Sequence, residues 1–470
     1  MSHPTFAIVG HPNKGKSSIV ATLAEDEQVA ISPDPGTTRQ ARGFQMRVND
    51  QILYELVDTP GFQRPRAVLA WLQAHERGAS ARPAVVQEFV TAHRADERYR
   101  DECELLRPVL AGAGILYVVD GAHPYSAEYE AEMEILRWTG QPRMALINMI
   151  GSGDHVNEWR RALNQYFSIV RVFDAQRADF SKRVELLRAF RELGEIHEGW
   201  SQALERAADE LERDRYARQL HAAAEITDLL IDVLSFQESA PAPDDSDQKA
   251  ITAELVDRLK SKVRRREQTT RHFIQELYSH RSLAATEQDI SVLAEDLFSQ
   301  RSFAVFGLSS TQLAATGAAT GALAGGVIDA AVGGASLLLG AGIGAIIGGV
   351  GAVLGADRIA RVRLLGSPLG GHRLTVGPVT APNLPWVILG RAVLHHRLVA
   401  ERNHARRDAL VLDAAGSSHL ADEIDSPLRK RMAAAFDRIR KNGGLASSER
   451  DALLEDVAAC LTNASGSMQI

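Results

Sequence analysis

A short loop near the start of the chain constrains the fold more than any other feature. The apolar run at residues 6–9 leads directly into residues 10–17, which read GHPNKGKS, and residues 17–24 have the composition of a helix. This is the GxxxxGKS/T pattern in its usual setting, after a strand and at the start of a helix. Backbone N–H groups of such a loop, together with the helix N-terminus, form a concave anion site. The loop therefore predicts an α/β domain whose first strand ends in a phosphate-binding site.

The side chains of this loop have separate expected roles. Lys16 would reach the β- and γ-phosphates and act in catalysis, and the Ser17 hydroxyl would bind Mg²⁺. The alternative, a glycine-rich turn without a ligand, is weakened by the motifs that follow. The loop residues expected to bind nucleotide are Gly10, His11, Pro12, Asn13, Lys14, Gly15, Lys16, Ser17 and Ser18.

Three further segments follow in an order that fits such a site. Residues 32–39, SPDPGTTR, form a turn-rich loop that carries two threonine hydroxyls. Two strand-like runs, 43–48 and 52–57, are joined by Asn-Asp as a hairpin. The second run ends in DTPG at residues 58–61. A carboxylate at the end of that strand can hold Mg²⁺ through water, and the glycine can offer its N–H to a γ-phosphate.

Taken together, GxxNxGKS, PGTTR and DTPG resemble the small GTPase domain of the TrmE–Era class over roughly residues 1–195. The resemblance implies that GTP and GDP bind, that Thr38 is a catalytic Mg²⁺ ligand in switch I, and that Asp58 is a further metal ligand. It also implies that Gly61 acts in catalysis at the start of switch II. In this class an asparagine at the position of Asn13 can help to bind a K⁺ ion that replaces an arginine finger. A loop without this ion is the alternative for Asn13.

Two departures affect hydrolysis and base recognition: the first is from Ras-like proteins and is also found in the TrmE–Era class, and the second is from the family pattern. Phe62 stands where Ras-like proteins place the glutamine that orients water, so slow intrinsic turnover is expected. Residues 148–151 read NMIG where the family has NKxD, so Asn148 remains but the base-reading aspartate is missing. Asp154 is three residues late and could replace it only in a rebuilt loop. GTP is expected from the resemblance, and a relaxed purine preference is the alternative.

The last base-contacting loop of the family has only a weak match here. Asp174 and Ala175 follow a strand-like run at residues 169–173 and are expected to contact the nucleotide.

With 470 residues the chain is too long for one ordinary domain. A G domain is expected at 1–196, with a helical insertion at about 62–112 that contains helices at 67–75 and 85–109. This insertion is either a nucleotide-sensing or partner-binding arm or a decoration without a signalling role.

The chain after the G domain is expected to be mainly α-helical. Its expected parts are a helical region at 197–301 with a flexible linker at 237–248, a glycine-rich apolar hairpin at 302–356 and a helical region at 357–470.

Residues 302–356 contain one formal charge, Asp329, and many glycines spaced four apart. Each half is long enough to span a bilayer, and this spacing permits close helix packing in lipid. The alternative is a hairpin buried in a soluble domain. A basic run at 260–266 precedes the segment, and it is either a solvated helix face or a contact for anionic lipid head groups.

The leading functional hypothesis is a nucleotide-switched, membrane-associated GTPase that hydrolyses GTP slowly with Mg²⁺ and, through Asn13, K⁺. Its alternatives are a non-hydrolysing membrane scaffold gated by nucleotide and a soluble Era-like ribosome or RNA factor. The layout is similar to that of a bacterial family with an Era-like G domain and a long C-terminal region of unknown function.

Composition limits the partners and the location. The net charge is −7, the chain has two cysteines, and the first strand-like run begins almost at the first residue. DNA is therefore not an expected partner, RNA is not favoured, and neither a disulfide scaffold nor a signal peptide is expected. A membrane lipid or membrane protein is the expected partner, a dimer is left open, and the expected location is the cytoplasm at the inner membrane.

Overall fold

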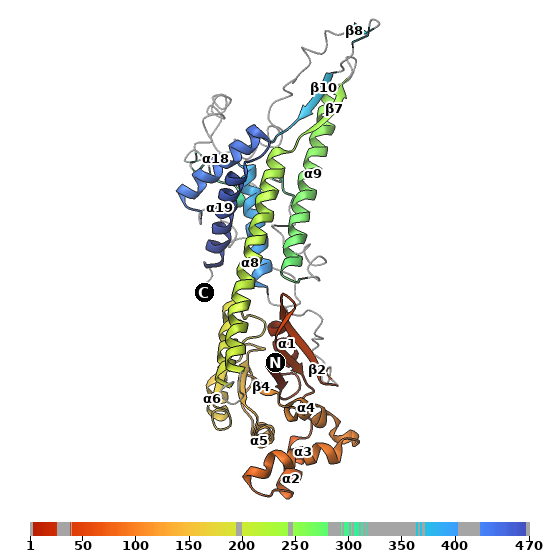
Figure 1. Cartoon of the computed structure of the whole chain (residues 1–470), viewed down its shortest axis with the longest axis vertical. Coiled ribbons are helices and arrows are strands. Elements are labelled where there is room, and N and C mark those ends of the chain that lie inside the picture. Colours follow the sequence, from red (N-terminus) through yellow and green to blue (C-terminus); the bar gives the residue numbers. More distant parts are fainter. Residues whose placement is uncertain are drawn as a thin grey trace. The chain divides into compact units, whose positions relative to one another are not determined.

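The computed structural model divides the chain into two compact units. The first contains Met1–Tyr216 with Glu401–Asp408, and the second contains Ala217–Ala400 with Ala409–Ile470. Figure 1 labels the elements of both units. The residues that the structure describes are 3–25, 38, 40–193, 200–242, 248–280, 293, 296–299, 302, 305–309, 312–313, 316, 363–364, 367–368, 372–402 and 424–466.

The first unit contains a six-stranded sheet with the order β2-β3-β1-β4-β5-β6. Only the β2–β3 pair is antiparallel, and the other four pairs are parallel. The predicted mixed, mostly parallel α/β fold is therefore confirmed. The strands are β1 Thr5–Val9, β2 Arg42–Val48, β3 Gln51–Asp58, β4 Gly114–Asp120, β5 Arg143–Asn148 and β6 Ile169–Val172.

Helices cover both faces of this sheet, which explains the continuous apolar runs of its central strands. Phe6 and Ile8 pack into one core cluster, which also contains Phe190 and Trp200, while Ala7 and Val9 belong to the cluster on the other face. The first cluster is built with α1, α7 and the start of α8, and the second with α5, α6 and the helices between β3 and β4. The bounds are α1 Lys16–Ala24, α5 Glu130–Trp138, α6 Val156–Leu163, α7 Phe180–Leu193 and α8 Trp200–Ser235.

The predicted hairpin between β2 and β3 is confirmed. Asn49 and Asp50 have φ angles of 48° and 63°, the positive values that a two-residue type I′ turn requires. The turn twists in the same sense as its strands, so β3 continues directly to Asp58 at the end of the sheet that faces the phosphate loop.

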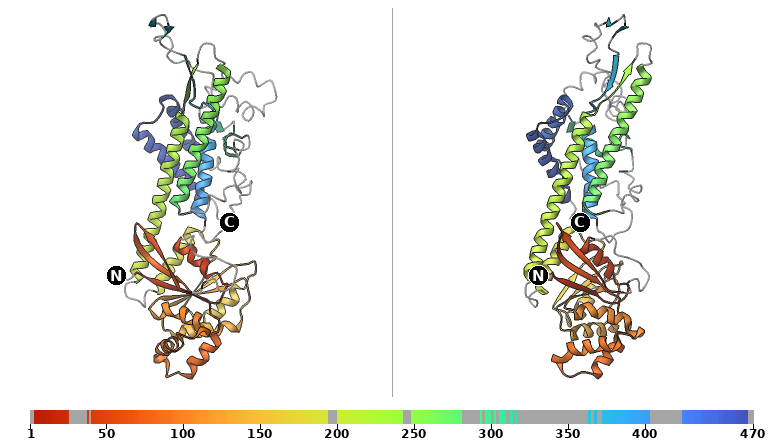
Figure 2. Two further views of the ribbon diagram at one scale, coloured as in Figure 1. Left: turned by 90° about the vertical axis from the view of Figure 1, so that its right-hand side faces the viewer. Right: turned by 45° about the vertical axis from the view of Figure 1, so that its right-hand side comes forward.

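The insertion after β3 contains three helices, shown in orange in Figures 1 and 2. The single helix expected at 85–109 is wrong, because α3 ends at His93 and α4 begins at Arg100. Between them the Asp96 side chain accepts a hydrogen bond from the Arg98 backbone N–H, which stabilises a turn instead of a continuing helix. The elements are α2 Pro65–Ala74, η1 Ala79–Ala81, α3 Arg82–His93, η2 Glu97–Tyr99 and α4 Arg100–Leu110.

The first unit extends beyond the expected boundary at residue 196. The beginning of α8 contributes Leu204, Ala207 and Leu211 to the apolar core of the first unit, so the division lies after Tyr216. The predicted closing helix at 180–193 agrees with α7.

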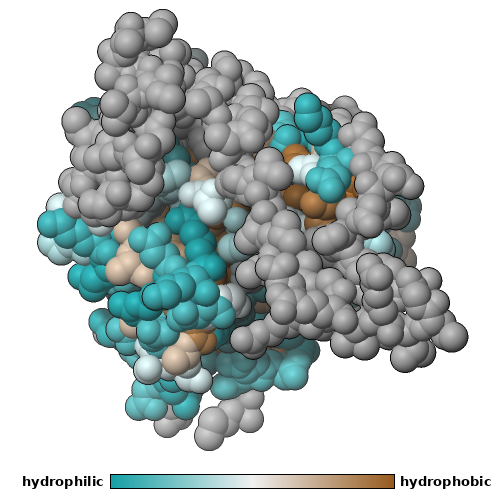
Figure 3. Space-filling model, turned by 90° about the horizontal axis from the view of Figure 1, so that it is seen from above, coloured by the Kyte–Doolittle hydropathy of each residue, from teal (hydrophilic) through white to brown (hydrophobic). Residues whose placement is uncertain are grey.

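The described part of the second unit is mainly helical. Its core joins the C-terminal half of α8 with four further helices, and Figure 2 shows α9 and α16 running side by side. Figure 3 shows that the described surface on one face is largely hydrophilic with small apolar areas. The bounds are α9 Gln248–Leu277, α16 Leu384–Glu401, α18 Ser426–Asn442 and α19 Ser447–Gly466.

The flexible linker expected at 237–248 is wrong over its first half. Glu238–Ala242 forms strand β7, which pairs antiparallel with β10, His372–Val376. Pro241 lacks an N–H group, but a two-stranded sheet leaves one edge of each strand unpaired, so proline is tolerated there. A further short pair joins β8, Arg363–Leu364, to β9, Ser367–Pro368. Residues 243–247 of the expected linker lie outside the described residues.

Most of the glycine-rich hairpin expected at 302–356 lies outside the described residues. Among the helices that are described, none is both long and apolar enough to cross a bilayer.

A buried ion cluster joins α9 to α16 in the second unit. Glu267 Oε1 accepts hydrogen bonds from Arg391 Nε at 2.7 Å and Arg271 Nη2 at 2.8 Å. Arg391 also donates to Ser302 Oγ at 3.0 Å. Burial raises the pKa of Glu267, but the two guanidinium groups outweigh it and hold this pKa below its ordinary value of 4.5. The carboxylate is therefore stabilised in its charged form.

Replacing Glu267 with glutamine is expected to lower the free energy of unfolding of the second unit by about 2 kcal/mol at pH 7, because charged hydrogen bonds become neutral ones. A group with a lowered folded-state pKa stabilises the fold above its unfolded pKa and loses that contribution as the pH falls through the folded value. The difference between wild type and Glu267→Gln should therefore shrink below pH 4.5. Urea unfolding at pH 7, 5 and 4 measures it, with the exposed Glu254→Gln as control. Equal stability of Glu267→Gln and wild type at pH 7 would contradict the expectation.

Candidate nucleotide-binding site

The loop between β1 and α1 has the backbone shape of an anion site. Gly10 has a φ of 142°, and a Cβ there would lie 2.4 Å from the Val118 carbonyl oxygen of β4. Gly15, with a φ of 81°, precedes α1, and its position provides no side-chain cap for that helix. The first N–H groups of α1 are thus available to an anion, which the positive end of the helix dipole favours.

Lys16 is the first residue of α1, and its side chain reaches back to the loop. Its Nζ donates hydrogen bonds to the carbonyl oxygens of His11 at 2.9 Å and Gly10 at 3.3 Å. Burial lowers the pKa of Lys16 to about 8, although the charges of Asp58 and Glu132 raise it. An anion such as a β- or γ-phosphate, bound at this loop, would compensate for the burial of the ammonium group.

The three residues predicted to handle Mg²⁺ converge at one carboxylate oxygen. Ser17 Oγ and Thr38 Oγ1 each donate to Asp58 Oδ2 at 2.9 Å. Asp58 Oδ1 is buried and has no hydrogen-bond partner among the described residues. Burial raises the pKa of Asp58, with the charge of Lys16 opposing this. Two hydroxyls and a carboxylate are the hard oxygen ligands that Mg²⁺ prefers, so these residues fit the ion and would hold it beside the phosphates.

Switch II begins in direct contact with the phosphate loop. A Cβ at Gly61 would lie 2.6 Å from the Pro12 backbone nitrogen, and the Phe62 N–H donates to the Gly10 carbonyl oxygen at 3.3 Å. The Phe62 side chain is fully buried in the core that contains Val68 and Leu106 of the insertion. Phe62 therefore anchors the insertion to switch II, and it cannot orient a water molecule.

The base end of the site is organised by Asn148. Its Nδ2 donates to the Lys14 carbonyl oxygen at 3.2 Å, and its Oδ1 accepts from the Ala175 N–H at 3.0 Å. Asp174 Oδ1 accepts from the N–H groups of Gln176 and Arg177, so this carboxylate stabilises its own turn. The three residues predicted for the base end thus lie together next to the phosphate loop.

Asp154 does not take the place of the missing base-reading aspartate. Its Oδ1 accepts a hydrogen bond from the Val156 N–H at 3.3 Å, at the start of α6. The loop before it is instead held by Asp120, whose Oδ1 accepts from Ala122 at 3.0 Å and Ile150 at 3.4 Å. Preference for guanine would have to come from other groups, or be weaker than in the family.

A buried carboxylate behind the phosphate loop was not predicted from the sequence. Glu132 of α5 accepts from Tyr117 OH at 2.9 Å, and its other oxygen lies 2.8 Å from His11 Nδ1. Burial raises the pKa of Glu132, and its hydrogen bond with His11 opposes this. The network ties α5 and β4 to the loop. Glu132 lies on a helix with two other glutamates, Glu130 and Glu134, so no sequence signal distinguishes it.

Comparison with known proteins identifies the family of this chain. Residues 160–459, more than half of the chain, match the profile described as a domain of unknown function, DUF3482. The chain belongs to the DUF3482 family. Residues 5–149 match a profile described as 50S ribosome-binding GTPase. The resemblance to a TrmE–Era-class P-loop GTPase domain, followed by a C-terminal region of unknown function, is thereby confirmed.

Curated relatives are similar to this DUF3482 protein over short stretches. It is 38% identical over 73 residues to the GTPase Der of Mycoplasma pneumoniae, which is 16% of each chain. It is 40% identical over 59 residues to the tRNA modification GTPase MnmE of Mycoplasmoides gallisepticum, which is 13% of each chain. The DUF3482 protein thus spans less than a fifth of the length of these relatives.

Solved structures show more distant similarity. Aquifex aeolicus Era bound to GDP and AlF₄⁻ has 18% identity and a TM-score of 0.29, and the match covers 41% of this chain and 57% of that chain. NFeoB from S. thermophilus, bound to GDP, AlF₄⁻ and K⁺, has 17% identity and a TM-score of 0.26, and the match covers 59% and 97%.

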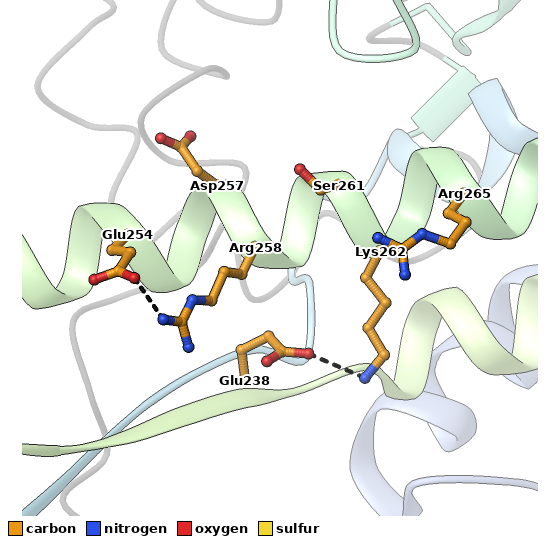
Figure 4. Close-up of a pocket in the computed structure, with 7 residues that line it drawn as sticks. All are labelled: Glu238, Glu254, Asp257, Arg258, Ser261, Lys262 and Arg265. Atoms are coloured by element: carbon orange, nitrogen blue, oxygen red, sulfur yellow. Dashed lines mark hydrogen bonds and ion pairs between the residues drawn. The ribbon is translucent and has the colours of Figure 1, made fainter.

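A hollow of about 720 Å³ lies between α9 and β7 of the DUF3482 region (Figure 4). Lys262 pairs with Glu238 at 3.1 Å, and Arg258 pairs with Glu254. Because the lining has as many acidic as basic side chains, it favours neither anions nor cations. Its lining residues are Glu238, Glu254, Asp257, Arg258, Ser261, Lys262 and Arg265.

The same pairing extends along the basic run of α9. Arg264 pairs with Asp296 at 2.6 Å, and Arg266 pairs with Asp232 at 2.7 Å. These ion pairs favour the interpretation of residues 260–266 as a charged helix face of the protein over a lipid contact.

Proposed function

We propose that this DUF3482 protein binds GTP with Mg²⁺ and hydrolyses it slowly, and that the bound nucleotide switches its helical region. The observation that carries this proposal is the convergence of the Ser17 and Thr38 hydroxyls on Asp58, next to Lys16 in the phosphate loop. Thr38 belongs to the segment that matches switch I, and Asp58 precedes switch II. A bound γ-phosphate with Mg²⁺ would therefore act on both switches at once.

Slow turnover follows from Phe62. Its side chain lies in the apolar core, so the water-orienting group of Ras-like proteins has no counterpart at this position. A K⁺ ion near Asn13 would supply positive charge at the transferring phosphate. The left-handed backbone of Asn13, with a φ of 60°, is compatible with its place in this tight loop.

The proposed effector is the helical region with its glycine-rich segment at residues 302–356. We propose that this segment associates with the cytoplasmic side of the inner membrane, with a lipid or a membrane protein as partner. The support is compositional, because the segment contains one formal charge and repeated glycine spacing. Docking of the helical region would then depend on the nucleotide.

A ribosome or RNA factor is the second candidate. It is favoured by the description of the family profile at residues 5–149, which names 50S ribosome binding. The net charge of −7 opposes it, because nucleic-acid affinity depends largely on basic residues that neutralise phosphates. A non-hydrolysing scaffold gated by nucleotide is the third candidate, and Phe62 favours it.

The first experiment measures affinity for GTP and ATP with Mg²⁺, and then phosphate release from GTP in K⁺ and in Na⁺. We expect tighter binding of GTP than of ATP and release that is slow but faster in K⁺. Equal affinity for GTP and ATP would mean that the loop at residues 148–154 no longer distinguishes guanine from adenine. Release no faster than in buffer would support the scaffold.

A second experiment separates the candidate partners. The full chain is mixed with vesicles of bacterial lipids, and separately with 50S ribosomal subunits, in the presence of GDP or a non-hydrolysable GTP analogue. Flotation with vesicles that depends on the nucleotide supports the membrane proposal. Sedimentation with ribosomal subunits and no flotation would overturn it in favour of the ribosome factor.

A further inference from the structure

One carboxylate on α4 holds the backbone of switch II. Glu102 Oε1 accepts hydrogen bonds from the N–H groups of Gln63 at 2.9 Å and Arg64 at 2.5 Å. The Glu102 side chain is fully buried. Hydrogen bonds from backbone N–H groups to a buried carboxylate are strong, and they offset the cost of removing the charge from water.

The switch II segment is thus held from two sides. On one side Gly61 contacts Pro12, and the Phe62 N–H donates to the Gly10 carbonyl oxygen of the phosphate loop. On the other side Glu102 holds the next two N–H groups. Four successive residues, 61–64, are therefore fixed between the nucleotide site and α4.

The same helix also contacts the chain that follows switch I. Glu104 Oε2, which pairs with Arg107, accepts a hydrogen bond from the Ala41 N–H at 3.3 Å. Ala41 lies three residues beyond Thr38 and directly before β2. One helix thus holds the backbone next to both switches.

The second oxygen of Glu102 differs from the first. Glu102 Oε2 is buried and has no hydrogen-bond partner among the described residues. Because an ionised carboxylate can accept several hydrogen bonds, this oxygen leaves capacity for another donor if the backbone at residues 61–64 moves. Glu102 is therefore suited to hold switch II in more than one position.

We propose that Glu102 is a positioning residue for GTP hydrolysis, which rests on the proposed function above. By fixing the N–H groups of Gln63 and Arg64, it sets where the Gly61 N–H points relative to the γ-phosphate. α4 packs with α2 and α3 in one apolar core, so Glu102 connects switch II to the packed helices of the insertion.

The test compares Glu102→Ala and Glu102→Gln with wild type in single-turnover hydrolysis and in nucleotide affinity. We expect Glu102→Ala to slow hydrolysis by about tenfold or more, because misplacement of catalytic groups is costly, while GDP affinity stays within about twofold. Glu102→Gln keeps an oxygen acceptor and should recover part of the rate. The control is Glu88→Ala, an exposed carboxylate on α3 that pairs with Arg77.

Hydrogen–deuterium exchange of the peptide that contains residues 61–64 gives a readout independent of turnover. Exchange there should be faster in Glu102→Ala than in wild type and Glu88→Ala. If wild-type protein binds nucleotide but does not hydrolyse it, the proposed GTPase activity fails. Faster exchange in Glu102→Ala would then still show that Glu102 holds the backbone of residues 61–64. Unchanged exchange, or an equal loss of rate, GDP affinity and thermal stability in both Glu102 variants, would overturn the inference.

Discussion

Replacing Lys16 with alanine is expected to weaken GTP binding by at least about a hundredfold and GDP binding by about tenfold or more. Each hydrogen bond to a charged group contributes about 1.5–3 kcal/mol, and Lys16 would donate to the β- and γ-phosphates of GTP but only to the β-phosphate of GDP. The ammonium group is buried and is held by the carbonyl oxygens of Gly10 and His11. Isothermal titration calorimetry with each nucleotide measures the loss.

This loss should not come from unfolding. Burial lowers the pKa of Lys16 to about 8, which means that the buried charge destabilises the nucleotide-free fold at pH 7. The alanine variant should thus be as stable as wild type without nucleotide, and lose only the stabilisation that nucleotide adds. Lys182→Ala, an exposed lysine on α7, is the matched control. Affinity within threefold of wild type for Lys16→Ala would refute the phosphate-site assignment.

The arrangement of the candidate site could be predicted because its residues follow short-range patterns. The phosphate loop is fixed by glycines with positive φ, and Thr38 and Asp58 occur at set distances from strand ends. Parallel strands then bring their carboxyl ends to one edge of the sheet, so segments far apart in sequence meet there. The hairpin at Asn49 and Asp50 was predictable for the same reason, since two residues determine its turn.

The buried carboxylates could not be predicted. Glu102 and Glu132 lie on helices that carry other acidic residues, and their partners are distant in sequence: the N–H groups of Gln63 and Arg64 for the first, and His11 for the second. The periodicity of apolar residues shows which face of a helix is apolar, but it does not show which acidic residue near the edge of that face is buried.

Local composition was also misleading where tertiary pairing decides the structure. The segment at 237–248 contains prolines and aspartates that favour a loop. Its first half nevertheless forms β7, because β10, more than a hundred residues later, supplies a pairing edge. The Asp154 carboxylate likewise satisfies the start of α6 instead of the base site, since a nearby N–H group is the easier partner.

Replacing Gly61 with alanine is expected to slow GTP hydrolysis at least tenfold while GDP binding changes little. A Cβ at this position would lie 2.6 Å from the Pro12 backbone nitrogen and 2.7 Å from its Cδ, far closer than such atoms approach in proteins. Pro12 is a rigid part of the phosphate loop, so switch II has to move away. The hydrogen bond between the Phe62 N–H and the Gly10 carbonyl oxygen, at 3.3 Å, would break with it.

GDP has no γ-phosphate, so under the proposed function its affinity would depend on Lys16, Ser17 and the base end and not on the placement of Gly61. GTP hydrolysis would depend on the placement of switch II. In Gly61→Ala the hydrolysis rate should therefore fall while GDP affinity stays close to that of wild type. Gly444→Ala is the control, because a Cβ there meets open space. Hydrolysis by Gly61→Ala at the wild-type rate would show that the contact between switch II and the phosphate loop has no part in catalysis. An equal loss of GDP affinity would show instead that the substitution distorts the phosphate loop itself.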